Sequence, residues 1–191
     1  MYHKQMKSTR TFLTEKKNQL EKKDKSKKGS VDERIRSLLA LLNAHPEHYT
    51  TSSCSGRIIL WRGSGKKNET EWLKVSHEPI DARFLTVPDV PGLVWLRLEP
   101  VILHVACADI RAAALLVDAA KKVCKKSTIL SITNKIIVEI RGSEFLEMPL
   151  VNNGQLLYQG EIDVLVEIVN EKMGKIKEKV KTLERVISRE L

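Results

Sequence analysis

The chain has 191 residues, of which 42% are hydrophobic, so it is long enough to bury a core of ordinary size. Its net charge of +9 favours a polyanionic partner, and no apolar run reaches the roughly 18 residues that a bilayer crossing needs. Three cysteines without a C-x-x-C pair argue against a disulfide framework, and the polar first 13 residues lack the apolar stretch of a secretory signal. We therefore expect one compact, cytoplasmic protein with no membrane segment and no obligate protein partner.

The charge is concentrated at the amino terminus. Residues 1–28 hold ten Lys and Arg against three acidic residues, a net charge of +7, which leaves +2 for the rest of the chain. We expect a basic helix or arm over residues 1–28, followed by one domain over residues 29–191. If the arm holds a nucleic acid backbone, the cations expected to do so are Lys16, Lys17, Lys22, Lys23, Lys27 and Lys28. The alternative is a solvated charged helix, which such runs commonly form.

Helical and β-prone patterns alternate irregularly along the chain. Helices are predicted over residues 1–23, from the Ser30–Glu33 capping box to the stop at 43–46, after the Asp109 N-cap, and from Glu161 to about 187. Strands are predicted at 57–61, 71–76, 94–98, 101–106, 129–132, 136–141 and 145–150, with a hairpin loop at 62–70. This order predicts a mixed α+β fold in which helices flank a mostly antiparallel sheet, and it does not fit the βαβ alternation of a Rossmann fold.

Two common nucleotide-binding motifs are absent from the sequence. Gly63-Ser64-Gly65 is a glycine pair without the third glycine or the following helix of a dinucleotide-binding loop. Gly65-Lys66 does not complete a Walker A motif, because Leu60 stands where that motif needs a glycine. We therefore interpret residues 63–65 as a turn.

The densest polar segment is Thr50-Thr51-Ser52-Ser53-Cys54-Ser55-Gly56-Arg57. Such a run makes a poor core and a poor helix. Small hydroxyl groups beside exposed backbone N–H groups suit the ribose and carboxylate of a small ligand, and Arg57 can bind a carboxylate with two N–H groups. The alternative is a Ser/Thr-rich turn before a strand, which the pattern alone favours.

Two histidines lie in or next to predicted strands, at positions where a ligand contact is possible. His77 follows a predicted strand, where loops and sites gather, although a lone histidine is more often structural. His104 alternates with Leu103, so it is expected to be a buried polar residue or a ligand contact. These histidines with Cys54 and Cys107 lack the short ligand spacings of a structural zinc site, apart from His-x-x-Cys, and we expect no metal.

Five separated segments share their residues with one known family. They are 24–33, Thr50–Ile58, Trp72–His77, Leu98–Cys107 and 138–150. All resemble the tRNA wybutosine-synthesizing protein 3 family, and the likeness runs from about Phe12 to Ile187. The Ser-Ser-Cys-x-Gly-Arg core is specific to that family. The chain departs from the family pattern at Ala108, where a basic residue is usual, and at Val123 and Thr128, where glycines are usual.

The resemblance implies methyl transfer from S-adenosylmethionine (SAM) to N-4 of the tricyclic base that is made from the guanosine 3′ of the anticodon of phenylalanine tRNA. It also implies a distinct α/β fold and no Rossmann domain. The cofactor-binding residues that it implies are Thr50, Ser52, Ser53, Cys54, Gly56 and Arg57, with His104 as a second histidine candidate. The catalytic residues that it implies are His77 and Asp24.

Methyl transfer from a sulfonium is an in-line displacement, so the protein mainly aligns the reactants and excludes water. We expect His77 to remove the proton of the target ring nitrogen, with Asp24 as its orienter or as an alternative base. Arg57 is expected to hold the methionine carboxylate of the cofactor. Two other interpretations stay open: a tRNA-binding module without catalysis, and a thiol enzyme that uses Cys54 with His77.

Overall fold

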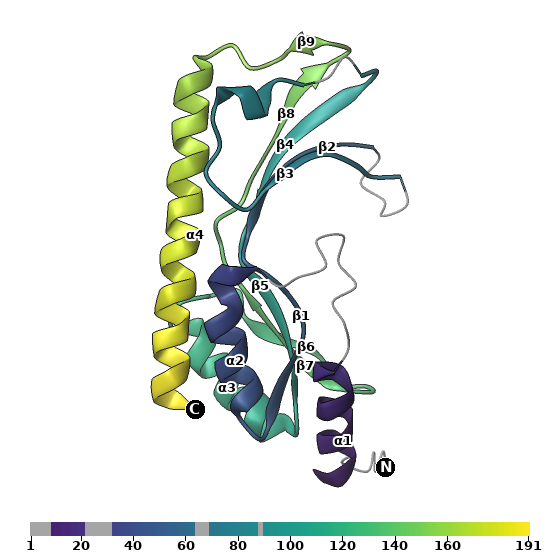
Figure 1. Cartoon of the computed structure of the whole chain (residues 1–191), viewed down its shortest axis with the longest axis vertical. Coiled ribbons are helices and arrows are strands. Elements are labelled where there is room, and N and C mark those ends of the chain that lie inside the picture. Colours follow the sequence, from purple (N-terminus) through teal and green to yellow (C-terminus); the bar gives the residue numbers. More distant parts are fainter. Residues whose placement is uncertain (1–8, 22–31, 64–68, 88–89) are drawn as a thin grey trace. The chain divides into compact units, whose positions relative to one another are not determined.

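The computed structural model describes residues 9–21, 32–63, 69–87 and 90–191 (Figure 1). Its helices are α1 (Thr9–Leu20), η1 (Glu33–Ile35), α2 (Arg36–Ala44), η2 (Ala82–Leu85), α3 (Ile110–Lys121) and α4 (Ile162–Glu190). Its strands are β1 (His48–Cys54), β2 (Arg57–Arg62), β3 (Glu71–Ser76), β4 (Leu93–Glu99), β5 (Ile102–Cys107), β6 (Thr128–Ser131), β7 (Ile136–Arg141), β8 (Leu146–Asn152) and β9 (Gln155–Leu156). No helix within these ranges is both long and apolar enough to cross a membrane.

The described residues form two compact units, each with its own antiparallel sheet. Unit 1 comprises the described residues within 1–55, 101–143 and 179–191, and unit 2 comprises the described residues within 56–100 and 144–178. The predicted fold class is confirmed, because the chain is mixed α and β and its strand pairings are all antiparallel among the described strands. The predicted boundary at residue 28 lies outside the described residues.

The sheet of unit 1 has the strand order β1-β5-β7-β6 and separates two layers of helix. Its strands alternate, so Leu103, Val105 and Val138 point to one face, where they are buried with Leu38 of α2 and Leu116 of α3. Figure 1 shows α2 and α3 on that side of the sheet and α1 on the other.

Helix α1 packs on the opposite face of that sheet through an aromatic contact. Phe12 lies 5.2 Å from Tyr49, ring centroid to ring centroid, and both side chains are buried with Ala106. Tyr49 and Ala106 are register partners on β1 and β5. Leu13 and Leu20 of α1 stay exposed, as expected for the weakly amphipathic helix that the sequence predicts.

The sheet of unit 2 has the strand order β3-β2-β4-β8-β9 and one fully buried face. Ile58, Leu60, Leu96 and Leu98 are all less than 1% exposed on that face. The part of α4 that belongs to unit 2 contributes apolar side chains at helical spacing, and Leu165, Val169, Met173 and Ile176 are buried. The side chain of Asn170 fixes α4 to the loop before η2, because it donates to the carbonyl oxygen of Ile80 and accepts from its N–H, both at 2.8 Å.

Most predicted elements are confirmed to within a few residues, and two predictions are wrong. The hydroxyl-rich run is not a turn, because residues 48–54 form strand β1 and pair with β5, with one irregularity between Thr50 and Ser52. Tertiary pairing therefore overrides the low β propensity of the serines. The described part of the second helix begins with the 3₁₀ turn η1 at Glu33, because Asp32 has non-helical backbone angles, and Asp32 makes no side-chain cap. Ser30 itself lies outside the described residues. The short elements η2 and β9 were not predicted.

Candidate functional site

The Thr50–Arg57 segment is divided between the two units. Residues 50–54 complete β1 and belong with Ser55 to unit 1, whereas Gly56 and the first residue of β2, Arg57, belong to unit 2. The side chains of the two halves therefore have to be described within their own units. Asp24, expected as a catalytic residue, lies outside the described residues.

In unit 1, Ser52, His104 and Glu139 form a hydrogen-bonded row across three neighbouring strands. Ser52 Oγ lies 2.7 Å from His104 Nδ1, and His104 Nε2 lies 3.1 Å from Glu139 Oε2. A carboxylate can only accept, so the Nε2–H of His104 donates to Glu139. In the neutral ring Nδ1 then carries the lone pair and accepts from the hydroxyl of Ser52. This arrangement fixes the orientation of an exposed serine hydroxyl.

The other polar groups of this segment differ in their hydrogen bonds and in their exposure. The N–H of Thr50 donates to Asn43 Oδ1 at 2.7 Å, and Thr51 Oγ1 donates to the carbonyl oxygen of His104 at 3.2 Å. The hydroxyl of Ser55 is buried and donates to Asp32 Oδ2 at 2.9 Å. Ser53 is exposed and Cys54 is half-buried. Ser52 and Ser53 are thus the hydroxyl groups of the segment that are most open to a ligand.

In unit 2, the backbone of Gly56 determines how His77 is oriented. His77 Nδ1 lies 2.9 Å from the carbonyl oxygen of Gly56, so Nδ1 carries a proton and donates to it. The lone pair of the neutral ring is then on Nε2, the nitrogen that a general base would use. Gly56 has φ +99°, and a Cβ there would lie 2.8 Å from Ile176 Cγ2 and 3.1 Å from the carbonyl oxygen of Glu99. Both the conformation and the packing therefore require glycine at this position.

Arg57 lies between a carboxylate and an aromatic ring. Its Nε–H donates to Glu99 Oε2 at 2.7 Å, and its guanidinium carbon lies 4.1 Å from the ring centroid of Trp72. The side chain is 23% exposed. A guanidinium has five N–H donors, and the bond to Glu99 uses one of them, so the group is oriented and still has donors for a second anion.

The two lysines of the basic arm that the structure describes differ in environment. Lys16 donates to the carbonyl oxygen of His45 at 2.5 Å, and burial lowers its pKa. The side chain of Lys17 is 75% exposed and lies 3.9 Å from Glu21. Lys17 is therefore better placed than Lys16 to meet an external phosphate. The arm residues Lys22, Lys23, Lys27 and Lys28 lie outside the described residues.

The thiol groups differ in accessibility. Cys107 and Cys124 are buried, and burial raises the pKa of Cys107 to about 12, with the carboxylates of Asp109 and Glu47 adding to the effect. A thiol with such a pKa is unreactive near neutral pH. Among the three cysteines only Cys54 is partly exposed.

Within each unit, the structure brings together some predicted residues with residues that the sequence did not indicate. Ser52 and His104 meet, as do Gly56 and His77, and these pairs are separated by 52 and 21 residues along the chain. The acidic partners were missed: Glu139 bonds His104, Glu99 bonds Arg57, and Asp32 bonds Ser55. Strand alternation places Glu139 on one face of its strand, but the register that brings it beside His104 is not readable from the sequence.

Comparison with known proteins shows similarity to one family along almost the whole chain. A family model described as methyltransferase TYW3 matches residues 9–189. The tRNA wybutosine-synthesizing protein 3 homolog of Xenopus laevis is 36% identical over 186 residues, which cover 92% of this chain and 74% of that protein. The mouse homolog is 35% identical, and the match covers 66% of its length. The chain thus spans 74% of the Xenopus laevis protein and just under two thirds of the mouse protein.

Archaeal relatives match in both sequence and structure. A Pyrococcus horikoshii protein named tRNA(Phe) 7-((3-amino-3-carboxypropyl)-4-demethylwyosine(37)-N(4))-methyltransferase 1 is 37% identical over 171 residues, which cover 85% of this chain and 87% of that protein. A solved structure from Pyrococcus horikoshii superimposes with a TM-score of 0.81 at 35% identity and covers 94% of this chain and 97% of that one. A hypothetical protein from Aeropyrum pernix gives a TM-score of 0.72 at 27% identity, with 84% and 99% covered.

Proposed function

This chain belongs to the methyltransferase TYW3 family, and from that premise we propose that it methylates N-4 of the 4-demethylwyosine-type base next to the anticodon of phenylalanine tRNA, with SAM as the methyl donor. The observation that carries the proposal is the extent of the match, residues 9–189. The named activity of the Pyrococcus horikoshii relative, which aligns with 85% of this chain, supports the same substrate. We place the reaction in the cytoplasm, and an odd number of cysteines supports a reducing compartment.

The residues of the Thr50–Arg57 segment suit a cofactor with a carboxylate, an ammonium group and ribose hydroxyls. Ser52 and Ser53 expose hydroxyl groups, and Arg57 is held in place with N–H donors beyond the one that Glu99 accepts. We propose that Arg57 binds the carboxylate and that Thr50, Ser52, Ser53 and Cys54 hold the other polar groups. Gly56 allows the backbone to approach, and His104 keeps Ser52 oriented. When bound, SAM supplies an electrophilic methyl group.

The target ring nitrogen has to lose its proton, and we propose that His77 accepts it. The bond from Nδ1 to the carbonyl oxygen of Gly56 supports this role, because it puts the lone pair of the neutral ring on Nε2. The ring of His104 bonds Ser52 through Nδ1 and Glu139 through Nε2, and we propose that it orients Ser52. Asp24 stays the proposed orienter or alternative base. Lys17 and the lysines at 22, 23, 27 and 28 are proposed to hold the tRNA backbone.

Two measurements on purified protein test the proposal. SAM should raise the melting temperature, because a ligand that binds the folded state stabilises it. Radiolabelled methyl groups from SAM should then appear in phenylalanine tRNA isolated from a strain that lacks this gene, and not in the same tRNA from the parent strain. Binding of SAM without transfer would indicate a tRNA-binding module, and no binding of SAM would refute the proposed cofactor.

A further inference from the structure

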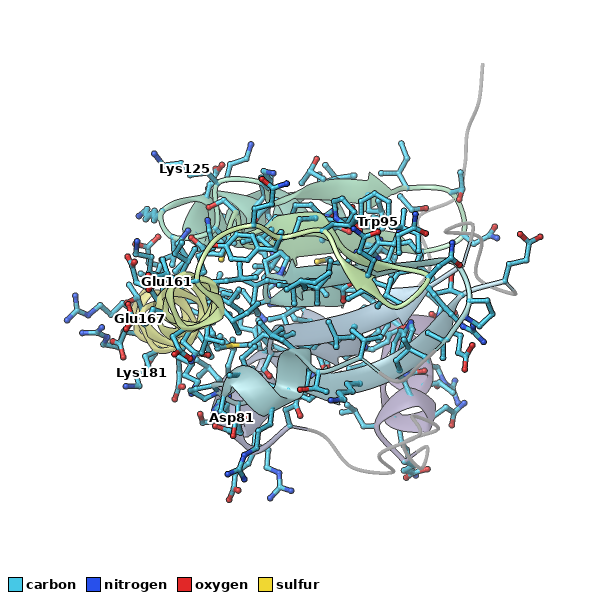
Figure 2. All side chains as sticks on the ribbon, turned by 90° about the horizontal axis from the view of Figure 1, so that it is seen from above. Asp81, Trp95, Lys125, Glu161, Glu167 and Lys181 are labelled. Atoms are coloured by element: carbon cyan, nitrogen blue, oxygen red, sulfur yellow. The ribbon has the colours of Figure 1, made fainter. Side chains whose placement is uncertain are left out.

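The three tryptophans of the chain lie on one face of the unit 2 sheet, opposite its buried face. Trp72 of β3, Trp61 of β2 and Trp95 of β4 are register partners in one row across the sheet. The rings of Trp61 and Trp95 are nearly parallel, with 18° between their planes and 6.0 Å between their centroids. Within unit 2, Figure 2 shows Trp95 away from Glu167 of α4 and from Glu161, which precedes that helix. We call this row of three rings the tryptophan row.

Two arginines lie over the tryptophan row, and two carboxylates hold them there. The guanidinium carbon of Arg57 is 4.1 Å from the ring centroid of Trp72, and that of Arg97 is 4.3 Å from the ring centroid of Trp61. Glu99 accepts from Arg57 and lies 3.6 Å from Arg97, which also pairs with Glu147. Two positive and two negative side chains leave this patch without net charge.

The three rings differ in how much of them is open to a partner. Trp61 is only 5% exposed, because neighbouring rings and guanidinium groups cover it. Trp72 is 45% exposed, on the strand that forms the edge of the sheet. The inner rings therefore act as a rigid support, and the outermost ring presents a large planar surface that the described part of the protein does not bury.

We propose that unpaired nucleobases of the RNA substrate stack on Trp72 and on the guanidinium plane of Arg57. The inference rests on the proposed function and deepens it, because it names the surface that receives the bases around the methylated position. Sequence-specific RNA binding commonly uses aromatic rings and arginine planes on an antiparallel sheet to stack splayed-out bases. The net charge of +9 supplies the attraction to a polyanion, while the uncharged tryptophan row addresses the bases and not the phosphates.

The composition of the chain provides a direct optical test. Because all three tryptophans lie in this row, the tryptophan fluorescence of the whole protein reports on this face alone. The probe is the anticodon stem-loop RNA of phenylalanine tRNA, which has an unpaired loop, with a fully paired duplex of equal length as the comparison. Stacking predicts quenching by the stem-loop that saturates with binding, and little quenching by the duplex.

The variants Trp72→Leu and Trp72→Phe separate stacking from simple burial of apolar surface. Leucine keeps the apolar character and loses the π face, so stem-loop affinity should fall by roughly 5- to 150-fold, and phenylalanine should restore part of it. The slope of log K against log salt should not change, because the substitution removes no cation. Ile168→Ala, at a 42% exposed position on α4, is the matched control and should bind the stem-loop like the wild type.

The outcomes distinguish this inference from the proposed function. Stem-loop binding without tryptophan quenching, or Trp72→Leu binding as tightly as the wild type, would overturn the stacking surface while methyl transfer could still be observed. If Trp72→Phe loses as much stem-loop affinity as Trp72→Leu, the stacking surface would also be overturned, because that pattern points to a protein or apolar contact. Quenching and the graded loss, in a protein that transfers no methyl group from SAM, would support the stacking surface and refute the proposed reaction.

Discussion

The Nδ1–H of His77 donates to the carbonyl oxygen of Gly56 at 2.9 Å, so a glycine that no other residue can easily replace determines which nitrogen of the histidine is basic. The bond links an imidazole that follows β3 to the first residue of unit 2, at the start of the Gly-Arg pair. Substitution of His77 therefore tests the proposed base, and substitution of Gly56 tests the backbone that orients it.

His77→Ala should lower the rate of methyl transfer by about 10²- to 10⁴-fold, the usual contribution of a positioned general base. Affinity for SAM should stay within a few-fold of the wild type, because the proposed cofactor contacts come from other residues. Single-turnover rates and calorimetric titration with SAM measure the two quantities. A variant that loses SAM affinity and retains the rate at saturating SAM would reverse the proposed role.

Gly56→Ala should destabilise the protein by about 1–3 kcal/mol, because alanine at φ +99° is strained and its Cβ meets Ile176 Cγ2. Urea denaturation measures the change in the free energy of unfolding. In an Ile176→Ala background, which removes the Cγ2 that the new Cβ meets, Gly56→Ala should cost less than in the wild type, because only the backbone strain remains. Equal stability of the wild type and Gly56→Ala would contradict the described backbone.

Arg57→Ala should abolish detectable SAM binding if the guanidinium holds the cofactor carboxylate. Arg57→Lys should recover little, because an ammonium group can neither bind a carboxylate with two parallel bonds nor stack on Trp72 in the same way. Arg62→Ala is the matched control, since Arg62 lies on the same strand and pairs with Glu71. Calorimetry should show wild-type SAM affinity for Arg62→Ala, and equal losses for both arginines would point to general damage of β2.

The stability of unit 1 should depend on pH through His48. Burial lowers the pKa of His48 from 6.5 to about 4, although its Nε2–H bond to the carbonyl oxygen of Ala112 opposes the shift. Between these values the unfolded chain binds more protons, so this contribution to stability is complete above about 6.5 and is lost as the pH falls toward 4. The loss is on the order of 2–3 kcal/mol.

His48→Gln keeps a donor for the carbonyl oxygen of Ala112 and does not titrate in this range. Its free energy of unfolding, measured by urea denaturation at several pH values, should change less between pH 7 and 4 than that of the wild type. Parallel curves for the two proteins would show that His48 does not set the acid sensitivity.

The basic arm should bind phosphates of the tRNA backbone. Lys22→Gln/Lys23→Gln should reduce the slope of log K against log salt for tRNA by roughly 0.7 to 0.9 for each phosphate that is no longer bound. Lys125→Gln/Lys126→Gln, at two exposed positions after α3, removes the same charge elsewhere and should leave the slope nearly unchanged. Substitution is preferable to deletion of residues 1–20, because Phe12 of α1 is part of the core of unit 1. Equal slopes of log K against log salt for both double variants would show that the arm does not contact the tRNA backbone.

The sequence predicted helices and most strands better than it predicted which strands pair and which side chains meet. Asp109 was expected to cap a helix, and its side chain accepts from the N–H of Ala112 at 2.7 Å, since capping depends only on neighbouring residues. The hydroxyl-rich run was expected to be a turn and forms strand β1, because its pairing with β5 depends on residues about 50 positions away. The same limit applies to the site, where Glu99 and Glu139 meet Arg57 and His104 only through strand register.

The most direct test of the proposed reaction is the mass of the tricyclic nucleoside in phenylalanine tRNA from a strain that lacks this gene, with the gene restored on a plasmid. We predict that the deletion strain accumulates the nucleoside without the N-4 methyl group, that the wild-type gene restores the mass of the methylated form, and that the His77→Ala gene does not. A fully methylated nucleoside in the deletion strain would contradict the proposed reaction, and full restoration by the His77→Ala gene would contradict the role of His77 in it.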